Sequence, residues 1–155
     1  MNIDEIKEIM DNFDPASLLP ELTTIEGKLE FIARVAVLVG PIILLILGLM
    51  YLFASPKEAN HYFGYRCYFG MGSVNAWRFT QRLAGIVWGG MGLILSAVML
   101  LITTGFAGLA VMDLIWKAAV CLFWEVGLVA AACLAINITA MIRFDRKGEY
   151  RRRKA

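Results

Sequence analysis

The residues with the most chemistry in this 155-residue chain lie in two places, a central connection and the last apolar segment. The connection, residues 60–77, reads NHYFGYRCYFGMGSVNAW and combines aromatic rings and glycines with one arginine, Arg66. An arginine among aromatic rings can stack on a ring and still donate two hydrogen bonds to a carboxylate or phosphate. Arg66 could therefore bind an acidic group of a peptide, lipid or protein, or tie the connection to a lipid phosphate.

The second place is Glu125, which lies within the third long apolar segment, residues 114–142. It follows Leu114 by eleven residues, which corresponds to roughly 16 Å along a helix. A carboxyl group near the middle of a bilayer costs about 2.5–3.5 kcal/mol to insert, so it must be protonated, paired with a cation or exposed to water. Two interpretations stay open: a functional proton or cation site, and a neutral acid hydrogen-bonded across the bundle.

Other reactive side chains are few, and they form no catalytic or metal-binding pattern. His61 is the single histidine, and Cys67, Cys121 and Cys133 lack the spacing of a disulfide framework or a metal site. The sequence also offers no pairing of a nucleophile with a base. We therefore predict a protein that is not an enzyme, with no cofactor and no nucleic-acid partner.

These residues must be positioned by membrane-spanning helices, because three long apolar runs dominate the chain. The sequence is 59% hydrophobic, and its mean hydropathy is +0.66. The runs cover residues 35–54, 83–112 and 114–142. Each can cross a hydrocarbon core of about 30 Å, which needs roughly 20 helical residues. We predict an all-α integral membrane protein with three transmembrane helices, whose solvent is the lipid bilayer.

Charge divides the chain into three predicted parts. Residues 1–30 form an acidic arm, in which residues 2–13 carry apolar side chains at helical spacing and predict an amphipathic helix. Residues 31–143 form the membrane module, and residues 144–155 form a basic tail. Because basic flanks stay in the cytoplasm, we predict that the central connection and the C-terminus are cytoplasmic and that the N-terminus is outside.

Small residues mark predicted contact points within the spans. Gly85, Gly89 and Gly92 form one stripe on the second span, and such residues let another helix approach closely. The partner could be another helix of the same chain or a second copy in a homo-oligomer. In the first span, Gly40 and Pro41 predict a bend, because proline removes a backbone donor and crowds the preceding turn.

At the central connection the chain resembles the SdpI family of membrane proteins. The matching residues are Asn60, the run Gly64-Tyr65-Arg66, and Trp77 eleven residues after the arginine, followed by Gly85. Members have three transmembrane helices, with this signature between the first and the second. The resemblance covers roughly residues 38–143, and it implies a binding role for the five signature residues Asn60, Gly64, Tyr65, Arg66 and Trp77.

Three positions near the signature differ from the usual family pattern. The family usually has threonine after the arginine, where this chain has Cys67. It usually has serine and asparagine further on, where this chain has Gly70 and Ser73.

The resemblance implies a bacterial membrane immunity and signalling protein. Such a protein confers toxin resistance by protecting the producing cell from its own secreted toxic peptide, and it holds a transcriptional regulator at the membrane. Its expected partners are therefore the toxic peptide and a cytosolic regulator. The alternative is a small oligomeric transporter or pore subunit, with Glu125 as the proton or cation site and the glycine stripe joining the subunits.

Overall fold

Three long helices make up the computed structural model, which describes residues 24–59 and 62–151. The helices are α2 (Ile25–Phe53), α3 (Val74–Thr104) and α4 (Val111–Arg143). Each is long and apolar enough to cross a membrane. This confirms the predicted all-α, multi-pass membrane protein with three spans. The amphipathic helix predicted for residues 2–13 lies outside the described residues.

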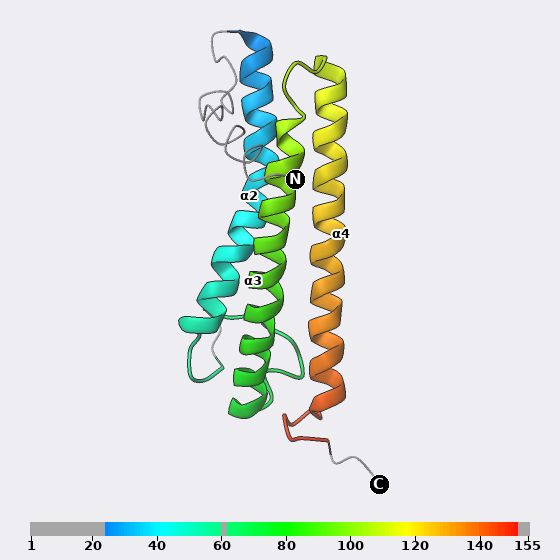
Figure 1. The fold of residues 1–155 in the computed structure, drawn as a ribbon. Coiled ribbons are helices and arrows are strands. Elements are labelled where there is room, and N and C mark those ends of the chain that lie inside the picture. The colour runs from blue at the N-terminus through cyan, green and yellow to red at the C-terminus, as the bar shows by residue number, and fades with distance from the viewer. Residues whose placement is uncertain (1–23, 60–61, 152–155) are drawn as a thin grey trace, which may run out of the picture.

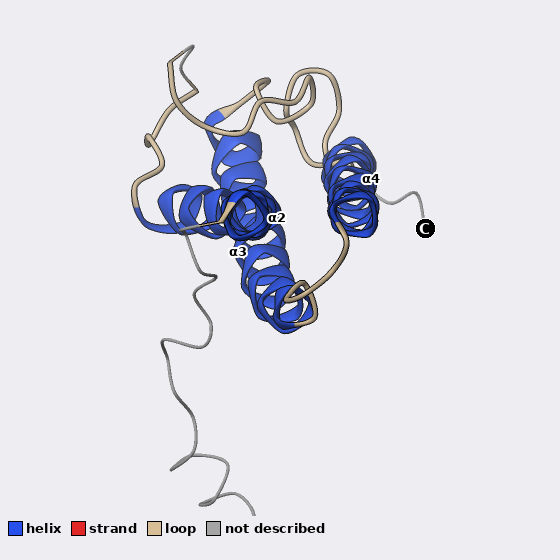
Figure 2. Cartoon of the chain, turned by 90° about the horizontal axis from the view of Figure 1, so that it is seen from above, coloured by secondary structure: helices blue, strands red, loops and turns tan. Residues whose placement is uncertain are grey.

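The helices run alternately in opposite directions, so α2 and α4 point the same way (Figure 1). Helices α2 and α3 pack extensively against each other, whereas α4 stands beside the pair (Figure 2). Residues 54–73, called the connection from here on, join α2 to α3. They lie at the end of the bundle where α4 also finishes, named here the signature end. At the opposite, far end α2 begins and residues 105–110 join α3 to α4.

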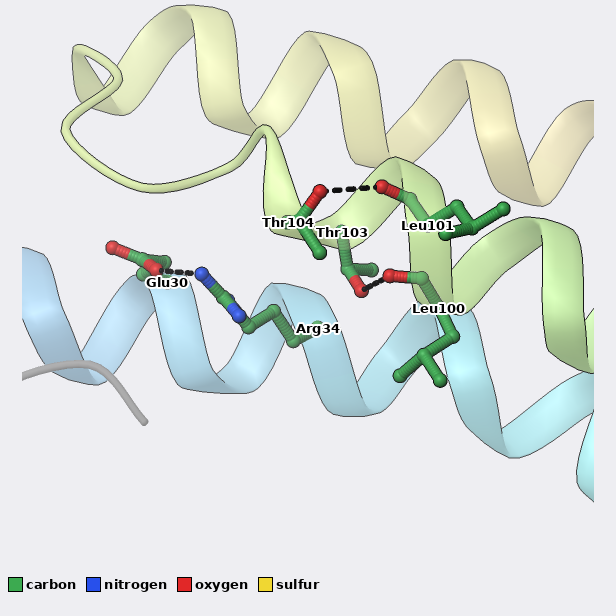
Figure 3. Close-up of polar contacts among 6 residues, drawn as sticks. All are labelled: Glu30, Arg34, Leu100, Leu101, Thr103 and Thr104. Atoms are coloured by element: carbon green, nitrogen blue, oxygen red, sulfur yellow. Dashed lines mark hydrogen bonds and ion pairs between the residues drawn. The ribbon is translucent and has the colours of Figure 1, made fainter. Parts of the chain in front are cut away.

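The helices are longer than a bilayer core is thick. Their 29, 31 and 33 residues correspond to roughly 44–50 Å, against about 30 Å of hydrocarbon. Polar side chains near the far end make hydrogen bonds within their own helices (Figure 3): Arg34 donates to Glu30 at 2.6 Å, and the hydroxyls of Thr103 and Thr104 donate to carbonyls three residues earlier at 2.9 and 2.7 Å.

Glycines allow α2 and α3 to approach closely. A Cβ atom added to Gly48 would overlap the backbone of Gly89, and one added to Gly92 would overlap the backbone at Leu45. A Cβ atom at Gly85 would also collide with α2. The structure therefore places the glycine stripe of α3 against α2 of the same chain, which is one of the two partners that its sequence allowed.

Large apolar side chains cover the outer faces of the bundle. Ile86, Leu101 and Phe123 are 64%, 73% and 75% exposed, respectively. Such exposure suits a lipid environment, since hydrocarbon tails are as apolar as these side chains. Helix α4 is the least covered, with 17% of its most apolar stretch buried against 28% of that of α3. It therefore offers the largest helix face to lipid or to a membrane-embedded partner.

We expect Gly48→Ala to destabilise the protein by about 1–3 kcal/mol, because the added methyl group would force α2 and α3 apart. The measurement is the free energy of unfolding of the purified protein in detergent micelles. Gly90→Ala is the matched control, since a Cβ atom at Gly90 meets nothing within 4 Å. Equal stability of the two variants would contradict the close packing of α2 and α3.

Candidate functional site

The connection is fixed to α3 by the side chain of Gln81, which is fully buried. The backbone N–H of Tyr65 donates to Oε1 of Gln81 at 2.8 Å, and Nε2 of Gln81 donates to the carbonyl of Tyr65 at 2.7 Å. One side-chain amide therefore satisfies both the backbone N–H and the carbonyl of Tyr65, which belongs to no helix or strand. Since an unpaired buried polar group costs about 1–3 kcal/mol, this pair determines the path of the connection.

Gly64 and Trp77 of the signature form one packed joint. Gly64 has a φ of +120°, a conformation that favours glycine. A Cβ atom at Gly64 would lie 2.7 Å from two carbons of the Trp77 ring. The ring is fully buried, and its Nε1 donates to the carbonyl of Pro56 at 2.9 Å. Both signature residues therefore fold the connection.

The side chain of Tyr65 links the connection to α4. Its hydroxyl donates to the carbonyl of Cys133 at 3.2 Å and accepts from Nδ2 of Asn137 at 3.3 Å. Its ring meets the Trp88 ring edge-on, with centres 5.6 Å apart. Burial, with a smaller contribution from Cys133, raises the pKa of Tyr65 above the usual 10.0, because a buried phenolate would lose its hydration.

Two of the three departures from the usual family pattern, at Gly70 and Ser73, are explained by local contacts. A Cβ atom at Gly70 would lie 2.8 Å from Sγ of Cys67 and 2.6 Å from Oγ1 of Thr80. The usual serine would therefore not fit at Gly70 beside the sulfur of Cys67. Ser73 caps α3, since its Oγ accepts from the N–H of Ala76 at 3.1 Å. Asparagine, the usual residue there, is an equally good cap.

The start of the basic tail packs onto the connection. Oγ of Ser73 donates to the carbonyl of Gly148 at 2.7 Å. Gly148 has a φ of +75°, and a Cβ atom there would overlap the backbone of Ser73. Phe144 is fully buried, and its ring centre lies 5.5 Å from that of Phe79 on α3. Residues 144–150 and the connection therefore form one packed unit, named here the cap.

The signature residues have different surroundings. Tyr65 and Trp77 are buried and Gly64 packs on the Trp77 ring, whereas Arg66 is exposed on the cap. Asn60 lies outside the described residues. Among the described signature residues, Arg66 is therefore the one whose side chain a partner could reach from the aqueous phase.

Glu125 occupies a separate site, midway along α4 and facing α2. It is 5% exposed, and its Oε1 is buried without a hydrogen-bond partner. A Cβ atom at Gly40 would lie 2.7 Å from its Oε2, so the carboxyl group fits only because position 40 is glycine. The structure thus places the intramembrane acid against Gly40, one of the two residues of the predicted bend. Helix α2 continues as one helix through Pro41.

Glu125 is one of the residues that line a groove of about 400 Å³ between α2 and α4. Ile43 and Val126 at its edges are 49% and 69% exposed, so the groove opens to the lipid. The other lining residues are Gly40, Leu44, Val129 and Ala130. The groove is therefore apolar except for one carboxyl group.

The structure keeps Arg66 and Glu125 apart. Tyr65, the neighbour of Arg66, contacts α4 at Cys133 and Asn137. Those residues follow Glu125 by eight and twelve positions, which corresponds to roughly 12–18 Å along the helix. The molecule therefore has two candidate sites, a basic cap at the signature end and a carboxyl-bearing groove in the membrane.

Sequence reasoning missed Gln81 and the role of Gly40. Gln81 follows Trp77 by four residues, so it shares the helix face of a signature residue. A polar side chain on that face was the available signal. No local signal could have linked Gly40 to Glu125, since 85 positions separate them.

We expect Gln81→Leu to release the connection from α3, because both backbone groups of Tyr65 would lose their partner. The measurement is the rate at which a maleimide labels Cys67, which is 8% exposed, in a background where Cys121 and Cys133 are alanine. The labelling rate should rise, whereas the control Arg82→Leu, at an exposed neighbouring position, should leave it unchanged. Equal rates would show that Gln81 does not hold the connection.

We expect the stability of the protein to fall above about pH 10 and to fall less in Tyr65→Phe. Because the pKa of Tyr65 is raised in the folded state, the unfolded chain ionises first, and its free energy falls relative to that of the folded state as the pH rises. The measurement is the free energy of unfolding in detergent from about pH 8 to about pH 11. The control is Tyr62→Phe, at a 96% exposed position, and identical pH profiles for both variants would refute the assignment.

Comparison with known proteins identifies the family. The model of the SdpI/YfhL protein family matches residues 57–141, which is more than half of the chain. Searches among curated proteins and among solved structures gave no match. The matched range runs from the connection through α3 and most of α4, and it includes Gly64, Trp77 and Glu125. The chain therefore belongs to the SdpI/YfhL protein family.

Proposed function

We propose that this chain is a membrane immunity and signalling receptor, which binds a toxic peptide or a partner at the membrane. Family membership supports the class. The observation that carries the proposal is Glu125, which has one buried carboxyl oxygen without a hydrogen-bond partner and lines a groove that opens to lipid. A ligand reaches such a groove from within the bilayer, so the site suits a membrane-embedded partner. The proposal assigns no enzymatic step to the chain.

We further propose that the signature end faces the cytoplasm and that the N-terminus is outside. Exposed cations gather at the signature end of the described chain. They are Lys57, Arg66, Arg78, Arg82, Arg143, Arg146, Lys147 and Arg151. At the far end Lys28, Arg34 and Lys117 are matched by Glu26, Glu30 and Asp113. This asymmetry supports the orientation, because basic flanks stay in the cytoplasm.

In this orientation the cap would meet a cytosolic regulator or the phosphate groups of the inner leaflet. Arg66 is exposed there and can donate two hydrogen bonds to an acidic group. The contact of Tyr65 with α4 at Cys133 supplies a link between the two sites. A displacement of α4 on ligand binding would move Tyr65, and with it the segment that carries Arg66.

A transporter or pore subunit is the second candidate, and the buried Glu125 is the observation in its favour. Three helices are few for a transport path, so several copies would have to assemble. The glycine stripe predicted to join those copies packs instead against α2 of the same chain. The receptor therefore accounts for more of the structure.

We expect cells that express this protein to survive a panel of membrane-active peptide toxins better than cells with an empty vector. Glu125→Gln should lose most of the protection at equal membrane levels, because an amide cannot provide the charge of a carboxylate. Arg66→Ala should keep survival but lose any regulatory response, since it lies on the cap.

The control is Lys117→Gln, which changes an exposed charge on the same helix without touching the groove. Loss of protection in this variant too would indicate a general effect of charge on α4. Absence of protection by the wild-type protein against every peptide would overturn the immunity function. Proton or cation flux into liposomes, abolished by Glu125→Gln, would favour the transporter instead.

A further inference from the structure

We propose that the groove between α2 and α4 binds an apolar membrane-inserted helix that carries one basic side chain near the middle of the bilayer. The ammonium or guanidinium group of that helix would donate to the carboxyl group of Glu125. This inference rests on the receptor function and adds the chemical class of the ligand.

The depth of the Glu125 carboxyl group in the bilayer restricts which ligands can reach it. Glu125 is the fifteenth of the 33 residues of α4, so it lies about 3 Å from the centre of the helix. Lipid head groups stay near the surface of the bilayer, far from this depth. The ligand must therefore bring its polar group into the hydrocarbon region on an apolar carrier, and a helix satisfies its own backbone there.

The carboxyl group of Glu125 lacks a hydrogen-bond partner at one of its two oxygens. Its Oε1 is buried and makes no hydrogen bond. Every other lining residue of the groove is apolar, on α2 as well as on α4. An acid at this depth is expected to be protonated, to pair with a cation or to face water. The described part of the chain supplies no such cation, which leaves the position open to a donor from a partner.

The size and the edges of the groove suit part of one face of a neighbouring helix. The edges are formed by the exposed side chains of Ile43 and Val126, and Ala130 lies one turn beyond the latter on α4. A volume of about 400 Å³ takes several side chains and no whole helix. A neighbouring helix would therefore lie along the groove and insert part of one face, with its basic residue directed at Glu125.

A second copy of the chain fits this site less well. In a copy inserted in the same orientation, the basic residues of the spans nearest in depth are Arg34 and Lys117. Arg34 is six positions from Gly40 and Lys117 eight from Glu125, so each lies roughly 9–12 Å away along its helix. Arg34 also pairs with Glu30. A small inorganic cation fits poorly too, because hard cations take six or more oxygen ligands and the groove offers one carboxyl group.

The test uses the full chain in nanodiscs and two synthetic transmembrane peptides of leucine and alanine, one with a central lysine and one with a central leucine. Binding is followed by energy transfer between labels on the peptide and on the protein. We expect the lysine peptide to bind the wild-type protein about tenfold more tightly than the leucine peptide, from the usual strength of polar contacts between membrane helices. Glu125→Gln should abolish this preference.

A second pair of variants tests the groove itself. Val126→Trp would fill its edge and should weaken the binding of the lysine peptide, whereas Leu134→Trp, at an exposed apolar position on the same helix, should not. Equal binding of both peptides by the wild-type protein, or a preference that survives Glu125→Gln, would overturn the inference. So would cross-linking of two copies through the groove that excludes both peptides.

This binding assay does not depend on cell survival. A lysine preference without protection in the toxin challenge would overturn the immunity function and leave the ligand class standing. Protection without a lysine preference would leave the immunity function standing and overturn the proposed ligand class.

Discussion

The two hydrogen bonds between Gln81 and the backbone of Tyr65 are the constraint on which the signature end depends. A connection at the edge of a bilayer must satisfy its backbone groups without a sheet or helix, because unpaired groups are costly there. Gln81 provides both partners from α3, and Trp77 one turn earlier excludes any side chain at Gly64. With its backbone fixed, Tyr65 reaches α4 and holds the third helix in place.

The two candidate sites differ in how their polar groups are used. In the cap, Gln81 pairs the backbone groups of Tyr65, and the signature residues Gly64, Tyr65 and Trp77 pack within the fold. In the groove, Glu125 keeps one buried oxygen without a partner. Since such a group destabilises the bundle, its cost is offset only if a partner, a proton or water uses it. The groove and the exposed Arg66 are therefore the two places where a partner could reach a polar group without unpacking the signature residues.

The fold could be predicted from the sequence because lipid imposes a simple rule. Each apolar run of about 20 residues must be a helix, and the structure has a helix over most of each run, although α3 ends at Thr104 and the second run extends to residue 112. The depth of Glu125 follows from the same counting. The contacts of Gln81, Gly40 and Gly148 could not be predicted, because each joins residues 16 to 85 positions apart. Which of these residues meet is decided by how the helices cross and by how residues 144–150 fold back onto the connection.

The packing of α4 explains how a groove can exist in so small a bundle. Helices α2 and α3 are locked together by glycines along their crossing, whereas α4 packs against the pair through buried side chains spaced from Leu114 to Ala140. Near the signature end it is held through Tyr65 and Phe144, and near the far end Leu114 packs in an apolar cluster with Phe106. Glu125 lies between these two anchorages. In the proposed receptor, a ligand in the groove would act on α4 beside Glu125, and a displacement of α4 would reach Arg66 through the bonds of Tyr65.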